Sequence, residues 1–169
     1  HDGLTSSVKY NYLYRLNSLG EGNPDEGEAL FQTYYEVDGN TVQLSTQGID
    51  DGSKYFPDKT DTGDKLDLDK YYLTSAASET YGVKTGDEFT FCNIADLKEH
   101  TVKISGVVTD NTHCYLYTSR KNATELAGVD SDVYNCIISD DKLDLDKDLV
   151  ASETSMAVSA GTLGDIMGA

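Results

Sequence analysis

The chain has 169 residues and a formal net charge of −17, from 30 acidic against 13 basic residues. Phosphate groups are bound by clustered lysine and arginine, so this balance excludes a nucleic-acid-binding protein and disfavours docking on anionic lipid. A cationic peptide or Ca²⁺ would be attracted to such a surface, although a large net charge also serves solubility alone. A chain of this length can bury a core of its own, and we expect one domain over residues 1–169.

Apolar residues make up 38% of the chain, which is low but sufficient for a globular core. Twelve tyrosines stand against no tryptophan. Tyrosine suits the half-exposed face of a strand, so this composition favours a β-rich protein with a polar surface. No apolar run approaches the roughly 20 residues that cross a bilayer, and nothing resembles a signal peptide. Because the first residue is His1, we expect the sequence to be a fragment of a longer protein.

The first element is expected at Lys9–Leu16, where Tyr10, Tyr12, Tyr14 and Leu16 alternate with other residues. Alternation with period two is typical of a strand, and it places these four side chains on one face. We expect the tyrosines to lie in the core or at its rim.

Residues 20–27 are rich in glycine, glutamate, asparagine and proline and are expected to form a loop. Two apolar runs, 29–37 and 41–49, then flank Asp38-Gly39-Asn40. Asp-Gly between two such runs is a strong signal for a β-hairpin. Residues 28–35 also fit a helix, and the sequence leaves this alternative open.

An acidic surface loop is expected over residues 58–69. Its last part, Asp64–Lys70 (DKLDLDK), recurs letter for letter at Asp141–Lys147. Alternating Asp and Leu suits an edge strand or a turn whose charges block edge-to-edge pairing. A Ca²⁺ loop is the functional alternative, but neither copy has the glycine and the distal glutamate of an EF-hand.

Residues 73–108 hold the clearest local signals. Thr74 or Ser75 can cap a helix that ends at Gly82, because glycine takes the left-handed conformation without strain. Phe89 and Phe91 then alternate with polar residues, as in a strand buried on one face. Residues 102–108 supply a partner strand, with a bulge expected at its glycine, Gly106.

The second half continues with a strand at 111–117, a helix that begins at Thr118 or Ser119 and ends at Gly128, and a strand at 133–138. The tail, residues 150–169, mixes small residues with a few apolar ones. It fits a frayed helix or the approach to a segment outside this sequence. The whole pattern predicts an α+β fold with a mixed, mainly antiparallel sheet and two or three short helices.

The three cysteines, Cys92, Cys114 and Cys136, all lie in strand-like runs. Three thiols exclude a complete disulfide framework within the chain and leave two alternatives, three free thiols or one bridge with one free thiol. A zinc site made from these cysteines and His113 would have no standard spacing.

No catalytic motif for hydrolysis, metal-dependent proteolysis, phosphate transfer or dinucleotide binding is present. His1, His100 and His113 are isolated from one another in the sequence. Asn122-Ala123-Thr124 matches the pattern for N-glycosylation. We therefore expect a protein that is not an enzyme, and the sequence gives no catalytic, cofactor-binding or metal-binding residue.

Residues 43–140 resemble the extracytoplasmic domain of FtsX/MacB-type ABC transporter permeases, in the form common in Gram-positive bacteria. The shared pattern is a helix, the motif Gly-Val-Lys-x-Gly-Asp, a strand, a loop and a strand that ends in Gly-Val. The segments that carry it are Gly48-Ile49, Ser53-Lys54-Tyr55-Phe56, Leu73-Thr74 with Ala77, Tyr81–Asp87 leading into Phe89, Val102–Val108, Tyr117-Thr118-Ser119 and Tyr134-Asn135.

The resemblance implies a MacB-like periplasmic core fold, held outside the cell between two membrane spans, with residues 150–169 leading toward one of them. Similar permeases work with a cytoplasmic ATPase subunit and often form homodimers. The implied function is non-catalytic: the domain couples a peptide, lipoprotein or cell-wall factor to the transport cycle. The family has no shared catalytic residue in this domain.

The alternative is a secreted or surface-anchored module that binds carbohydrate or Ca²⁺. Tyrosine-rich strands and acidic loops would serve such a module equally well.

Overall fold

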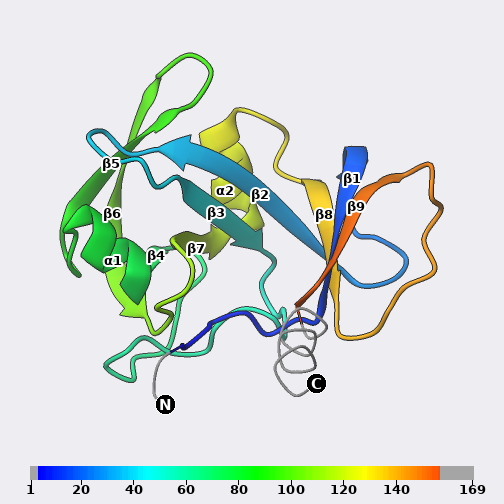
Figure 1. Cartoon of the computed structure of the whole chain (residues 1–169), viewed down its shortest axis with the longest axis horizontal. Helices are drawn as coiled ribbons and strands as arrows, with labels where there is room; N and C mark the ends of the chain where they lie inside the picture. Colours follow the sequence, from blue (N-terminus) through cyan, green and yellow to red (C-terminus); the bar gives the residue numbers. More distant parts are fainter. Residues whose placement is uncertain (1–3, 157–169) are drawn as a thin grey trace, which may run out of the picture.

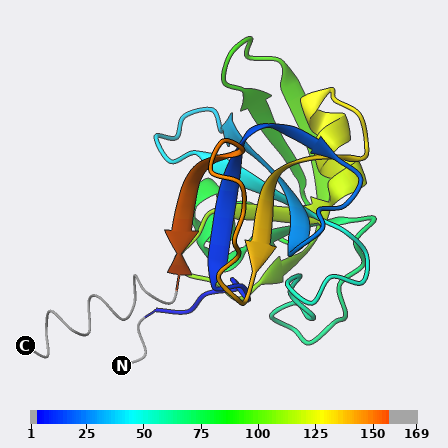
Figure 2. The same ribbon diagram turned by 90° about the vertical axis from the view of Figure 1, so that its right-hand side faces the viewer.

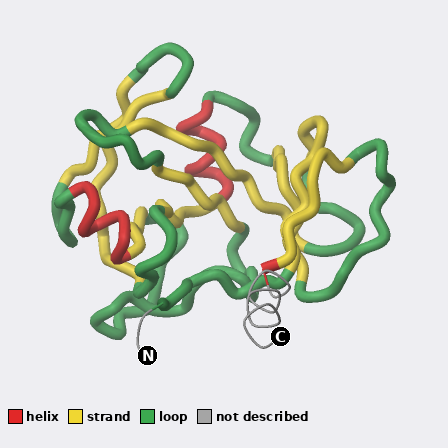
Figure 3. Tube along the Cα trace, viewed as in Figure 1, coloured by secondary structure: helices red, strands yellow, loops and turns green. Residues whose placement is uncertain are grey.

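The computed structural model describes residues 4–156, which form nine strands and two helices (Figures 1 and 3). The elements are β1 (Tyr12–Glu21), β2 (Glu28–Glu36), β3 (Leu44–Ile49), β4 (Tyr71–Thr74), α1 (Ser75–Tyr81), β5 (Glu88–Asn93), β6 (Glu99–Val108), β7 (Tyr115–Ser119), α2 (Arg120–Ala127), β8 (Val133–Ser139) and β9 (Val150–Ser155). The pairings β3–β7 and β4–β6 are parallel, and the other pairings between these strands are antiparallel. The expected α+β class with a mixed, mainly antiparallel sheet is therefore confirmed.

Six of these strands close into a hydrogen-bonded ring, in the order β3-β7-β4-β6-β5-β2, because β2 also pairs with β3. The β2–β3 pairing is the hairpin expected around Asp38-Gly39, so the helical alternative for residues 28–35 is wrong. The other closing contact, between β2 and β5, consists of only two residue pairs, Tyr35 with Asn93 and Glu36 with Cys92.

One apolar cluster fills the ring, and every strand of the ring contributes to it. Closing a sheet on itself leaves no free edge and sends alternate side chains inward. Phe89 and Phe91 of β5 are both buried here, as their alternation predicted. The remaining strand residues of the cluster are Tyr35, Leu44, Leu73, Val102, Ile104 and Leu116.

The strand β2 also belongs to a second, outer sheet with the order β2-β8-β1-β9. Its first residues pair with β8, whereas its last residues pair with β5. Figure 2 shows β9, β1 and β8 side by side. A second apolar cluster, which includes Leu13, Leu30, Tyr117 and Ile138, joins residues of the outer sheet to residues of the ring strands. The strand β2 thus holds the ring and the outer sheet together.

Both helices begin and end where the sequence places them. The hydroxyl of Thr74 accepts a hydrogen bond from the backbone N–H of Ala77, and Ser119 caps α2 in the same way. Gly82 and Gly128 follow the two helices with φ values of +67° and +75°, the conformation that favours glycine at this position. No helix within residues 4–156 is long and apolar enough to cross a membrane.

Several boundaries differ from the prediction. The strand β4 follows directly on the acidic loop without a turn signal and was not predicted. Residues 150–155 form strand β9 on the edge of the outer sheet rather than a frayed helix, and residues 157–169 lie outside the described residues. The bulge in β6 falls at Ser105, because Ile104 and Gly106 pair with consecutive residues of β4.

The first strand also differs, since it begins at Tyr12 and buries side chains on both of its faces. Tyr12, Tyr14 and Leu16 pack in a cluster on one face, as predicted. Tyr10 precedes the strand and packs with Leu13 in the cluster between the outer sheet and the ring. The alternation pattern did not predict the burial of Leu13, because it assumes that one face of the strand is exposed, whereas both faces of β1 are covered.

The hairpin between β5 and β6 projects from the ring (Figures 1 and 3). Its turn is closed by hydrogen bonds between the backbones of Asn93 and Lys98 and between Leu97 and Asn93. Leu97 has a φ of +60° and is 61% exposed. An apolar side chain therefore stands in water at a position whose backbone conformation favours glycine.

We expect Leu97→Gly to raise the free energy of unfolding by about 0.5–1 kcal/mol. Relief of left-handed backbone strain contributes about 1–2 kcal/mol, and the greater entropy of an unfolded glycine offsets about 0.5–1 kcal/mol of it. Urea denaturation checks this. Leu149 is also exposed but has no positive φ, so Leu149→Gly should lower stability instead. Equal losses in the two variants would contradict the prediction.

Candidate functional site

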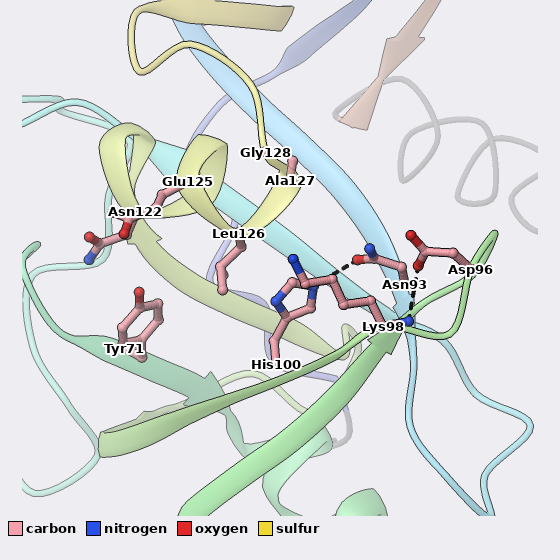
Figure 4. Close-up of a pocket in the computed structure, with 10 residues that line it drawn as sticks. All are labelled: Tyr71, Asn93, Asp96, Lys98, His100, Asn122, Glu125, Leu126, Ala127 and Gly128. Carbon is pink, nitrogen blue, oxygen red and sulfur yellow. Dashed lines mark hydrogen bonds between the residues drawn. The ribbon is translucent and has the colours of Figure 1, made fainter.

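A pocket of about 410 Å³ lies between the C-terminal end of α2 and the projecting β5–β6 hairpin (Figure 4). Three segments that are distant in the sequence form its walls: one residue of β4, the hairpin, and the last turns of α2. Sites for small ligands commonly combine such segments with a few convergent polar groups. The lining residues are Tyr71, Asn93, Asp96, Lys98, His100, Asn122, Glu125, Leu126, Ala127 and Gly128.

On the hairpin side, His100 is held in a fixed position. Its Nε2 lies 2.8 Å from the side-chain oxygen of Asn93, and its ring centre lies 5.6 Å from each of the rings of Tyr35 and Phe91. Burial, with a smaller contribution from the positive charge of Lys98, lowers the pKa of His100 below its ordinary value of 6.5. His100 is therefore a neutral hydrogen-bonding group at pH 7.

On the α2 side, the side chain of Asn122 donates hydrogen bonds to the backbone carbonyl of Asp69 and the hydroxyl of Thr118. The first of these bonds ties the helix to the loop before β4, and the second ties it to β7. Burial and the negative charge of Glu125 raise the pKa of the Tyr71 hydroxyl, which therefore stays protonated and can donate a hydrogen bond. Figure 4 places Tyr71, Asn122 and Glu125 on one side of Leu126 and the hairpin residues on the other.

The glycosylation pattern at Asn122–Thr124 lies inside α2. The hydroxyl of Thr124 is buried and donates to the backbone carbonyls of Arg120 and Lys121. Glycosylation needs an accessible, extended acceptor, so this folded helix does not present one.

His113, the other histidine within the described residues, lies at a different place, beside a buried carboxylate. The Asp110 side chain is fully buried and accepts five hydrogen bonds, from the backbone N–H groups of Ser7, Thr112 and His113, the Ser7 hydroxyl, and Nδ1 of His113. Burial alone would raise the pKa of Asp110, but the hydrogen bonds from His113 and Ser7 outweigh it and hold the pKa well below its ordinary range.

This carboxylate has a structural role that the sequence did not indicate. The hydroxyl of Ser7 also lies 2.6 Å from that of Tyr117, and Thr5 exchanges backbone and side-chain hydrogen bonds with Asn111 and Thr112. Asp110 thus fastens the segment before β1 to the ring. His113 bonds Asp110 rather than Ser7, so the three side chains do not form a nucleophile–base pair.

The three cysteines are free thiols and lie at separate places. Cys92 is in β5, Cys136 is buried in β8, and Cys114 comes directly before β7. Burial raises the pKa of the Cys136 thiol to about 11. Among residues 4–156 no group of three or more His, Cys, Asp or Glu side chains is arranged to hold a metal ion.

The two copies of the repeated heptapeptide form loops that cover different clusters. Leu66 and Leu68 pack against the cluster between the ring and the outer sheet, whereas Leu143 and Leu145 cover the opposite face of the outer sheet. In both loops the leucines face a core and the aspartates face water. This arrangement explains the alternation of Asp and Leu by packing.

The sequence indicated no site residue, and of the residues that line the pocket it singled out only His100, Asn122 and Gly128, none of them as part of a site. The hairpin and the end of α2 are separated by more than twenty residues and meet only through the ring. No spacing in the sequence indicates that Lys98 and Glu125 face one pocket.

We expect Lys98→Gln to raise the pKa of His100 toward its ordinary value, because the substitution removes a nearby positive charge that opposes protonation. An NMR titration of the imidazole protons measures this. Lys103→Gln, an exposed substitution farther along β6, should leave the titration unchanged. An equal effect of both substitutions would contradict a local interaction.

We also expect Asp110→Asn to lower the free energy of unfolding by about 3 kcal/mol, the scale for losing hydrogen bonds to a buried charged group. Urea denaturation at neutral pH tests this against Asp51→Asn, an exposed substitution with an expected effect within about 0.5 kcal/mol. The folded-state pKa of Asp110 is depressed, so its contribution is present above the unfolded pKa of about 3.9 and is lost as the pH falls below it. The free energies of unfolding of the wild-type protein and of Asp110→Asn should therefore converge as the pH falls. A difference that stays constant with pH would contradict this role.

Comparison with known proteins gives little further information. No family model matches the chain, and no curated protein matches it. Among solved structures, the chain is similar to the periplasmic region of MacB from Actinobacillus actinomycetemcomitans, with 11% sequence identity and a TM-score of 0.43. That match covers 95% of this chain and 84% of the other.

Proposed function

We propose that this chain is the extracytoplasmic domain of an ABC transporter permease and that it couples an external partner or substrate to the transport cycle without performing catalysis. The observation that carries the proposal is the unit formed by α1, β5 and β6. Its order of elements follows the FtsX/MacB-type pattern seen in the sequence: a short helix, the motif at residues 82–87, a strand, a loop and a strand.

Residues of the motif make specific backbone contacts in the fold, so the pattern reflects a structural unit and is not a chance run of residues. After α1, the backbone N–H of Lys84 donates to the Asp87 carboxylate, closing a tight turn. The N–H of Gly86 donates to the carbonyl of Ile104, and the N–H of Ile104 donates to the carbonyl of Asp87. The motif therefore joins the helix to both strands of the hairpin at once.

The pairing of the first and last strands also supports a domain inserted between two membrane spans. The strands β1 and β9 are antiparallel neighbours, and Tyr12 pairs with Ser155. The backbone N–H of Met156 donates to the carbonyl of Asn11 at 2.8 Å. The start of β1 and the end of β9 thus lie together, as a domain carried on two adjacent membrane helices requires.

The proposal includes the partners that the resemblance implies. A cytoplasmic ATPase subunit would act through the membrane part of the permease, and a second copy of the permease would complete a homodimer. The external partner would be a peptide, a lipoprotein or a cell-wall factor. Residues 1–169 would form a single domain on the outer face of the membrane, with the tail leading toward a span.

The test uses the full-length protein in its host cell. Apolar segments of roughly 20 residues are expected both before residue 1 and after residue 169. In a Cys92→Ser, Cys114→Ser background, Lys147→Cys in an exposed loop should react with a membrane-impermeant thiol reagent in intact cells. The same background without the new cysteine is the control, since Cys136 is buried.

Labelling of Lys147→Cys only after the cells are permeabilised would contradict an extracytoplasmic position. A signal peptide before the domain with no apolar segment after it would replace the permease by a secreted binding module. ATP hydrolysis by the purified domain alone would also contradict the proposal.

A further inference from the structure

The pocket between α2 and the hairpin is lined by one positively charged side chain, Lys98, and by two carboxylates, Asp96 beside it and Glu125 on the α2 side. Asp96 is bonded within the hairpin by the backbone N–H of Lys98, whereas Lys98 and Glu125 take part in none of the ion pairs within residues 4–156. Both line the pocket, yet they do not pair with each other. The pocket thus keeps two opposite charges apart and available.

The Lys98 side of the pocket includes Asp96 and His100. Figure 4 shows the Lys98 side chain extending along His100 into the pocket rather than toward Asp96. Only the backbone N–H of Lys98 bonds the Asp96 carboxylate, at 3.0 Å. The effect of Lys98 on the pKa of His100 reflects the same proximity. This side therefore presents an ammonium group beside a neutral imidazole, which suits a carboxylate.

The Glu125 side has the opposite character. Glu125 lies in the last turn of α2, where the helix dipole adds partial negative charge. The protonated hydroxyl of Tyr71 and the side chain of Asn122 line the same wall. This side suits an ammonium group with neighbouring hydrogen-bond partners.

We propose that the pocket binds a small zwitterion, either a free amino acid or a short peptide, with its carboxylate toward Lys98 and its ammonium group toward Glu125. Leu126 lies between the two charged sides and would contact the apolar part of the ligand. A volume of about 410 Å³ accommodates a ligand of this size.

Other ligand classes satisfy only part of the site. A dianion would meet Glu125 and the field of a chain with a net charge of −17, and a dication would meet Lys98. A neutral sugar would leave both charges uncompensated. Binding of a zwitterion in this pocket does not depend on the permease assignment.

The first experiment titrates the isotopically labelled domain with glycine, glycylglycine and triglycine and follows its amide NMR signals. These probes carry the same two charges at increasing separation. Saturable shifts are expected for residues 93–100 and 122–128 with at least one probe. N-acetyl-glycylglycine and glycylglycine amide each lack one charge and should bind at least about tenfold more weakly, the scale for one charge-assisted hydrogen bond.

The second experiment reverses the protein charges. Lys98→Glu and Glu125→Lys should each abolish binding of the best probe, and the double variant should restore it, with the ligand reversed in the pocket. Lys103→Glu and Glu79→Lys are matched exposed controls on β6 and α1 and should bind normally. Unchanged amide signals outside the pocket confirm that each variant is folded.

Several results would overturn the proposal. They are absence of shifts with all three probes, equal binding of the blocked peptides, saturable shifts confined to another surface, or failure of the double variant to recover binding. Saturable binding of the neutral sugar chitobiose in this pocket, unaffected by the charge reversals, would assign the site to carbohydrate instead.

Discussion

The guanidinium group of Arg120 ties the start of α2 to both the ring and the outer sheet. It is 7% exposed and makes a two-pronged ion pair with Asp50, at 2.8 and 2.9 Å. The same group donates to the carbonyls of Gly22 and Asp132. The end of β3, the loop after β1 and the approach to β8 therefore meet at the first residue of α2. Pairing of this kind satisfies the hydrogen-bonding groups of a buried charge.

The pocket is a consequence of this arrangement. Arg120 fixes the start of α2, and Gly48 lets its middle approach the sheet, since a Cβ on Gly48 would lie 2.5 Å from that of Ala123. Ser119 caps the first turn of α2 and Gly128 ends its last turn, so both ends of this eight-residue helix are fixed. Glu125 consequently lines the pocket at a position set largely by Gly48, Ser119 and Arg120, none of which lines the pocket.

Local signals were enough to predict the elements whose chemistry is contained in a few residues. Capped helices, the hairpin at Asp38-Gly39 and the alternation of Phe89 and Phe91 belong to this class. The strands β4 and β9 were missed because their pairing depends on distant partners, and β9 (VASETS) carries almost no apolar pattern. Ring closure by β2 and the Arg120–Asp50 pair, 70 residues apart, likewise leave no local trace. The pocket could not be predicted for the same reason, because its walls meet only when the ring closes.

The hairpin wall of the pocket stands beside a weakly paired seam of the ring, because β5–β2, like β4–β7, consists of only two residue pairs. One of the two pairs between β5 and β2, Tyr35 with Asn93, includes the residue whose side chain bonds His100. The α2 wall, by contrast, is anchored to β2, β3 and β7. A ligand that contacts both walls must favour the state in which the hairpin is docked, because binding to one state shifts the population toward it. A ligand that bridges both walls would therefore oppose separation of β5 from β2, whatever its chemical identity.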